Sequence, residues 1–154
     1  MQQPLRSGAS SKIVSVKLGI LCALMCAYLM AQSTAQIEAS AKAHLAARNV
    51  NAALADYQKL AAMNPQSAVY EDQIGFILAS TNHLGDALPH LQHATELDPK
   101  MALAWYHLGV ADCLIKNTQS CAESLQHAVA LAPGNGDYHF RLGSALIRRR
   151  ISTF

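Results

Sequence analysis

Apolar and small residues recur along most of the chain at the spacing of helix faces. Ile74, Gly75 and Leu78 stand at i, i+1 and i+4, so they share one face of a helix. Ala87 and Leu91, with Ala94 three residues further on, line one face of a second helix. The pattern predicts an all-α protein built from short amphipathic helices.

The helical pattern repeats with a fixed period. Pro65, Pro99 and Pro133 are separated by equal steps of 34 residues, and each closes a similar phrase, namely LAAMNP, ATELDP and AVALAP. Each proline ends one helix, because it cannot continue the hydrogen-bond ladder. Each unit is therefore predicted to be an antiparallel helix pair that buries its apolar face only by stacking on its neighbours. Asn82 and Asn117 fall in the turns inside the pairs, where a left-handed residue is often needed.

The repeat resembles the tetratricopeptide repeat family. The third unit carries the motif most fully, with Trp105, Tyr106 and Leu108-Gly109 in its first helix and Cys121 and Leu125 in its second. The resemblance implies an α-solenoid of about three units followed by a terminal half-repeat. We expect a signal peptide or membrane anchor at 1–35 and a repeat domain at 36–154. The repeats are expected at about 34–67, 68–101 and 102–135, with a half-repeat at 136–150.

In this family the first helices of the units line a concave groove in which partner peptides lie. A column is the set of residues at one position of successive repeats. The columns that line the groove in this family hold apolar and aromatic residues here, which predicts an apolar groove with aromatic edges that suits an apolar segment of another protein. The family's clamp for a C-terminal carboxylate is not supported by the residues in these columns. The alternative is that some of these side chains pack between adjacent repeats. The predicted partner-binding residues are Lys42, Asp72, Phe76, Tyr106, Val110 and Phe140.

The first 35 residues have the pattern of an export signal. The stretch 18–31 is uncharged and follows Lys12 and Lys17, and the small residues Ser33 and Ala35 come after it. This order is typical of a secretory signal peptide. The rival interpretation is an uncleaved membrane anchor across 18–37. Both interpretations place the repeat domain outside the cytoplasm, either periplasmic or secreted, or tethered to the membrane and facing outward.

Charge and composition exclude some classes of function. Hydrophobic residues make up 51% of the chain and charged residues 14%, which is too apolar for a disordered protein. Three of the twelve basic residues precede the apolar stretch, which leaves nine basic against ten acidic residues in the rest of the chain. A nearly neutral body gives no electrostatic reason to expect a nucleic-acid partner.

Two pairs of side chains need a chemical interpretation. Cys113 and Cys121 lie on opposite helices of the third pair near its turn, so they form either a disulfide bridge or two small buried thiols. His90 and His93 share one helix face, but no third metal ligand stands at helical spacing. We therefore expect them to lie on a solvated helix face and predict no metal site.

No catalytic motif or phosphate-binding loop is found, so we expect neither an enzyme nor a cofactor. The chain is predicted to be an exported scaffold or adaptor that binds a partner protein in its groove. The alternative is the repeat portion of a larger enzyme, secretion or envelope component, since the last unit stops after one helix.

Overall fold

A computed structural model describes residues 24–25 and 32–152 of the chain. The chain divides into two units, Met1–Ile37 and Glu38–Phe154. In the first unit, the described residues are helical. None of the helices in the described part of the chain has both the length and the apolar character needed to cross a membrane. Most of the predicted signal or anchor at 18–37 lies outside the described residues, so the export signal stays a prediction.

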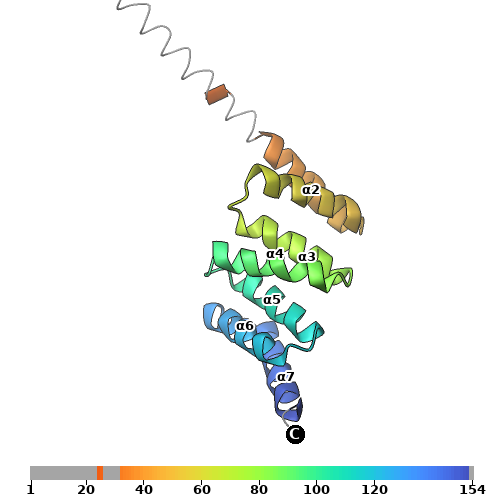
Figure 1. Cartoon of the computed structure of the whole chain (residues 1–154). Coiled ribbons are helices and arrows are strands. Elements are labelled where there is room, and N and C mark those ends of the chain that lie inside the picture. The colour runs from red at the N-terminus through yellow and green to blue at the C-terminus, as the bar shows by residue number, and fades with distance from the viewer. Residues whose placement is uncertain (1–23, 26–31, 153–154) are drawn as a thin grey trace, which may run out of the picture. The chain divides into compact units, whose positions relative to one another are not determined.

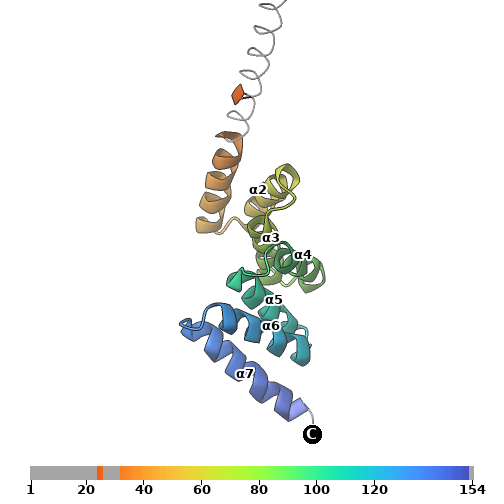
Figure 2. The same ribbon diagram turned by 90° about the vertical axis from the view of Figure 1, so that its left-hand side faces the viewer.

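The second unit is a row of helices. A helix at residues 38–46 precedes α2 (Val50–Met63), and the following helices are α3 (Ala68–Ser80), α4 (Leu84–Leu97), α5 (Ala102–Leu114), α6 (Thr118–Leu131) and α7 (Gly136–Ser152). The closest helix pairs are α3 with α4 and α5 with α6. Figures 1 and 2 show the pairs stacked in chain order, with α7 at one end of the row. The predicted all-α solenoid of stacked pairs is confirmed.

The prolines mark the ends of the second helices. α2, α4 and α6 end at Met63, Leu97 and Leu131, two residues before Pro65, Pro99 and Pro133. The turns inside the pairs follow the same period, because Arg48, Asn82 and Lys116 all have positive φ angles, between 58° and 65°.

The prediction for Asn117 needs a correction. Asn82 takes up the left-handed conformation, but the equivalent residue in the next repeat is Lys116. Asn117 follows one position later and caps α6, where its side-chain oxygen accepts a hydrogen bond from the Ser120 N–H. Asparagine suits both positions, so its presence in a turn does not decide between them.

Small residues bring the paired helices together. A Cβ atom on Gly75 would lie 2.5 Å from Leu91 Cγ, and one on Gly109 would lie 2.8 Å from Leu125 Cγ. Leu91 and Leu125 are almost completely buried, as are Ala87 and Cys121, which lie one helical turn before them. The second and third pairs are therefore each held together by a contact of leucine on glycine, in agreement with the predicted helix faces.

Candidate partner-binding groove

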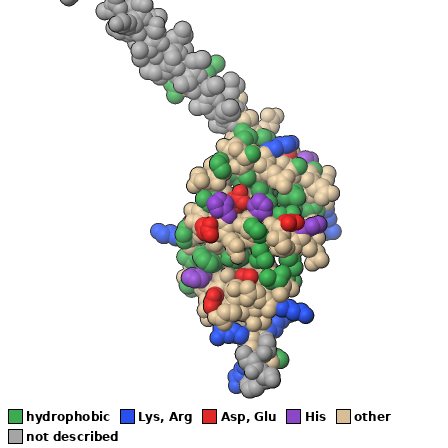
Figure 3. Space-filling view, in the orientation of Figure 1, with side chains coloured by type: hydrophobic (Ala, Val, Ile, Leu, Met, Phe, Trp, Pro, Cys, Tyr) green, Lys and Arg blue, Asp and Glu red, His purple; other side chains and the backbone are tan. Residues whose placement is uncertain are grey.

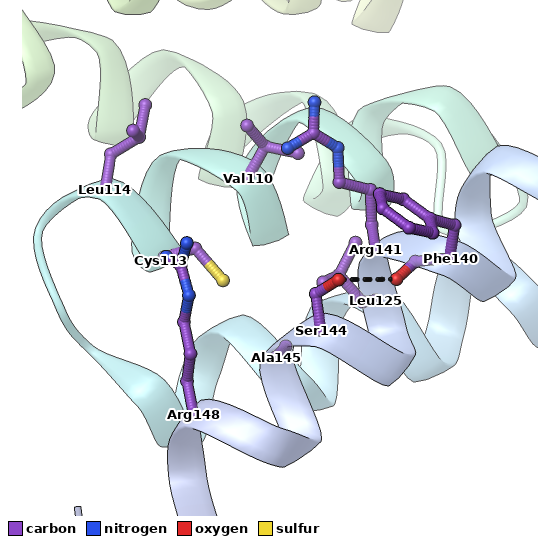
Figure 4. Close-up of a pocket in the computed structure, with 9 residues that line it drawn as sticks. All are labelled: Val110, Cys113, Leu114, Leu125, Phe140, Arg141, Ser144, Ala145 and Arg148. Atoms are coloured by element: carbon purple, nitrogen blue, oxygen red, sulfur yellow. Dashed lines mark hydrogen bonds between the residues drawn. The ribbon is translucent and has the colours of Figure 1, made fainter. Parts of the chain in front are cut away.

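The first helices of the repeats line a hollow along α3, α5 and α7. Phe76 from α3, Tyr106 and Val110 from α5 and Arg141 from α7 all contribute to its wall, together with Ala79, Ser80, His107 and Leu114. A second hollow between α5, α6 and α7 shares Val110, Leu114 and Arg141 with the first (Figure 4). The shared residues join the two hollows into one groove, and this surface is the candidate site.

Aromatic rings form a row along the groove from α3 to α7. The ring centroids of Phe76 and His107 are 4.7 Å apart, and those of Tyr106 and Tyr138 are also 4.7 Å apart, with nearly parallel planes in both pairs. Tyr106 and His107 connect the two stacks at 5.7 Å. Phe76 keeps 41% of its surface exposed and Tyr138 is buried. Rings fixed in this way give a partner rigid apolar surface at little entropic cost.

A buried hydrogen bond supports this row from below. The Asp72 carboxylate is completely buried, and its Oδ1 lies 2.8 Å from His107 Nδ1. Asp72 Oδ2 is buried without a hydrogen-bond partner among the described residues. The prediction that Asp72 meets a partner is therefore wrong in its geometry, because Asp72 lies beneath the groove and holds His107 in place.

Basic side chains stand on the α7 side of the groove. Arg141 lines both hollows and Arg148 lines the second one. Figure 4 shows the Arg141 side chain beside the Phe140 ring and the Arg148 side chain reaching toward Cys113. The groove is thus apolar on α3 and α5 and carries positive charge on α7. It is therefore more polar than the apolar groove predicted from the sequence.

The remaining predicted residues divide into two groups. Val110 and Phe140 line the groove, and Phe140 is 72% exposed. Lys42 is exposed on the helix at 38–46 but lines neither hollow. On the same helix, Glu38 accepts a hydrogen bond from the Tyr70 hydroxyl, and this bond raises the pKa of Tyr70 to about 12.

Cys113 and Cys121 form a disulfide that links α5 to α6. Their Cα atoms are 5.0 Å apart, within the usual range for a bridge. Cys121 is completely buried in the core of the third repeat, and Cys113 reaches the wall of the second hollow. Of the two interpretations of this pair, the structure has the bridge, which ties the groove wall on α5 to the first turn of α6.

The two histidines considered for a metal have separate partners. His90 Nδ1 lies 2.7 Å from Glu71 Oε2, and His93 Nδ1 lies 3.5 Å from Glu96 Oε2. Within the described residues, no group of three or more histidine, cysteine or acidic side chains is arranged to hold a metal ion.

Comparisons with known proteins agree with this geometry at the level of the fold. No protein-family model matches the sequence. A curated relative, small glutamine-rich tetratricopeptide repeat-containing protein 2 of Mycosarcoma maydis, is 27% identical over 100 residues, which cover 65% of this chain and 28% of the relative. The chain therefore spans well under half the length of that relative.

Solved structures give the clearest match. The TPR domain of Arabidopsis OM64 superimposes with a TM-score of 0.70 at 18% identity, over 74% of this chain and 94% of that domain. The first TPR domain of human RPAP3 gives 0.72 at 13% identity, over 76% and 92%. MamA from Desulfovibrio magneticus gives 0.70 at 24% identity, over 76% and 66%. The fold is that of tetratricopeptide-repeat (TPR) domains.

Two groove residues of this TPR domain were missed in the sequence. His107 and Arg141 occupy the same column of the repeat, 34 residues apart, and Gln73 holds that column in the second repeat. The predicted groove residues Tyr106 and Phe140 occupy the preceding position of the repeat. The signal that would have found them is the change at this position of the repeat from the neutral amide of Gln73 to the imidazole of His107 and the guanidinium of Arg141.

Proposed function

We propose that this chain is an exported scaffold that holds an extended or helical segment of another protein in the groove along α3, α5 and α7. The observation that carries this proposal is the row of stacked rings from Phe76 to Tyr138, which leaves apolar surface open to solvent on a rigid floor. Exposed aromatic surface in a concave site is where binding energy usually concentrates. We propose no catalytic role, since the groove offers anchoring surface rather than a nucleophile with its base.

The chemistry of the groove suggests what the segment carries. Apolar side chains of the segment would lie against Phe76, Val110 and Leu114, which belong to α3 and α5. A carboxylate or backbone carbonyl of the segment would face Arg141 on α7, because a guanidinium pairs best with such acceptors. The partner segment is thus proposed to be mainly apolar, with at least one acceptor on the side that faces α7.

Structural neighbours support peptide binding as the general role. One is the first TPR of Spaghetti (RPAP3) bound to the HSP90 peptide SRMEEVD, with a TM-score of 0.71 at 14% identity. Another is the complex of the TPR2B domain of yeast Sti1 with an Hsp70 peptide, with a TM-score of 0.69 at 17% identity. These likenesses support the fold and the concave mode of binding, while the partner of this chain is inferred only from its own side chains.

Export is the second part of the proposal. The uncharged stretch at 18–31 behind two lysines has the character of a signal peptide or anchor. The Cys113–Cys121 disulfide supports the same proposal, because such bridges persist in oxidising compartments and are rare in the cytoplasm. A partner would accordingly be an envelope, periplasmic or secreted protein.

A second candidate is that the same groove works as one part of a larger enzyme or envelope component. The observation that favours it is the 28% share of the curated relative that this chain covers. Reading the gene beyond the codon for Phe154 decides between the two candidate functions, because an immediate stop codon excludes the second.

Site-specific photocrosslinking tests the groove. A benzophenone side chain at Phe76 should form covalent adducts with one protein in the cell envelope, and mass spectrometry should map the crosslink to a single apolar segment. The same group at Gln126, exposed on α6, is the matched control and should not capture this segment. Equal capture from both positions, or crosslinks scattered over many unrelated segments, would refute the groove assignment.

A further inference from the structure

The last helix lacks the neighbour that its counterparts have. Gly75, Gly109 and Gly143 occupy one column of the repeat, at steps of 34 residues. Leu91 packs against the first glycine and Leu125 against the second. A Cβ atom on Gly143 would meet nothing within 4 Å in the described part of the chain. One face of α7 therefore has the shape that receives a helix, and no described helix lies on it.

This face of α7 is also apolar. Leu146 and Ile147 lie one turn after Gly143 and are 40% and 64% exposed. Their equivalents in the second repeat, Leu78 and Ala79, are partly buried against the core that α4 completes. Apolar side chains that are covered in a complete repeat are thus left open at the end of the row. We call the surface formed by His139, Gly143, Leu146 and Ile147 the end face.

The geometry points to a second copy of this chain as the occupant of the end face, with α7 packed antiparallel on α7 of its partner and the two helices crossing at Gly143. A glycine at the crossing point lets both helix axes approach closely, as Gly75 and Gly109 do within the repeats. A two-fold contact needs only one kind of surface, because each copy offers the same face to the other. In this register Ile147 of one copy lies near His139 of the other, and both side chains are exposed in one chain.

The charges at the two ends of α7 favour an antiparallel arrangement of the two α7 helices. α7 carries Asp137 in its first turn and Arg149 and Arg150 in its last turn. Figure 3 shows basic side chains at the end of the molecule that holds α7. A parallel pair would bring the arginines of both copies together, whereas an antiparallel pair sets the last turn of one copy beside the first turn of the other. The helix dipoles are also oppositely directed in the antiparallel pair.

Molar mass in solution tests this inference on the full chain. Light scattering on a sizing column should give twice 16.5 kDa for the protein with Cys22→Ser and Cys26→Ser, which removes unrelated thiol coupling. Gly143→Glu in this background should give the mass of one chain, because the new side chain occupies the crossing point. Gly134→Glu is the matched control, since Gly134 also has nothing within 4 Å, and it should stay dimeric. The helical circular dichroism of both variants should equal that of the parent.

A crosslink locates the contact. Gly143→Cys in the same background should form an intermolecular disulfide under mild oxidation, because the two-fold axis places the two thiols together, and Gly134→Cys should not. A parent that has the mass of one chain would overturn the inference. A dimer that persists in both Gly143→Glu and Ile147→Glu would overturn it as well, because another surface would then hold the copies together.

Discussion

His107 Nδ1 lies 2.8 Å from the completely buried carboxylate of Asp72, across the boundary between the second and third repeats. Phe76 stacks on the same imidazole from the groove side. The pair therefore connects α3 to α5 and fixes the ring that a partner would meet. The same hydrogen bond therefore contributes to the stability of the helix stack and to the shape of the groove.

Removing the buried carboxylate should loosen this boundary. Asp72→Ala leaves the buried His107 without its hydrogen-bond partner and opens a small cavity, so the free energy of unfolding should fall by about 2–4 kcal/mol. Asp86→Ala, at an exposed carboxylate in the first turn of α4, is the control and should cost no more than about 1 kcal/mol. Urea denaturation of both variants measures the difference, and equal losses would contradict the role assigned to the pair.

Gly109 and Gly143, at equivalent positions of successive repeats, should respond in opposite directions to replacement by alanine. Gly109→Ala forces a Cβ to within 2.8 Å of Leu125 Cγ and 3.1 Å of the Leu125 backbone nitrogen, so it should cost about 1–3 kcal/mol. At protein concentrations low enough to keep the chain monomeric, Gly143→Ala meets open space and should instead stabilise α7 by up to about 1 kcal/mol through helix propensity. Thermal unfolding of the two variants checks the sign, and a loss for both would show that the end of the stack is not open.

Asp112 should make stability depend on pH. Burial raises the pKa of this carboxyl from 3.8 to about 6, so its folded pKa lies above its unfolded value. The stabilising contribution of the neutral acid is then complete below about pH 4 and is lost as the pH rises through 6. Because Asp112 lines a hollow that water can enter, we expect an effect of about 1 kcal/mol rather than the full shift.

The comparison that isolates Asp112 uses its uncharged analogue. Asp112→Asn should be more stable than the parent at pH 7.5, and this advantage should disappear near pH 4. Asp86→Asn controls for the loss of one carboxylate elsewhere. Parallel curves for parent and Asp112→Asn across this range would show that the carboxyl is not held in an environment that disfavours its charge.

Removing the disulfide should destabilise the third repeat. The bridge closes a loop with a sequence separation of 8, for which chain entropy predicts about 2–3 kcal/mol. The variant with both Cys113→Ala and Cys121→Ala should lose about this amount, and reductant should have no further effect on it. Thiol titration of the exported parent under denaturing conditions should find neither of these cysteines reactive, and two reactive thiols from this pair would exclude the bridge.

Much of the architecture could be predicted from the period alone. Equal steps between Pro65, Pro99 and Pro133 fix where the second helices end, because a proline cannot continue a helix wherever it occurs. Glycine at positions 75 and 109 predicts close helix contacts for the same local reason. These features depend on single residues and their nearest neighbours in sequence.

The groove was less predictable because it depends on residues about 34 positions apart. Asp72 shares a column with Tyr106, yet Asp72 is completely buried and Tyr106 is partly exposed. The difference arises because His107 from the next repeat lies over Asp72. A column assigns a side chain to a helix face, but the burial of that side chain depends on what the following repeat places above it.

Calorimetric titration of the segment captured from Phe76, prepared as a synthetic peptide, is the most direct test of the groove. We expect saturable one-to-one binding to the parent. Phe76→Ala should weaken this binding at least tenfold, which corresponds to about 1.4 kcal/mol, and Gln126→Ala on α6 should leave it unchanged. Circular dichroism should show that both variants stay folded, since both side chains are exposed. Equal affinity for the parent and Phe76→Ala, or a similar loss in Gln126→Ala, would contradict the account.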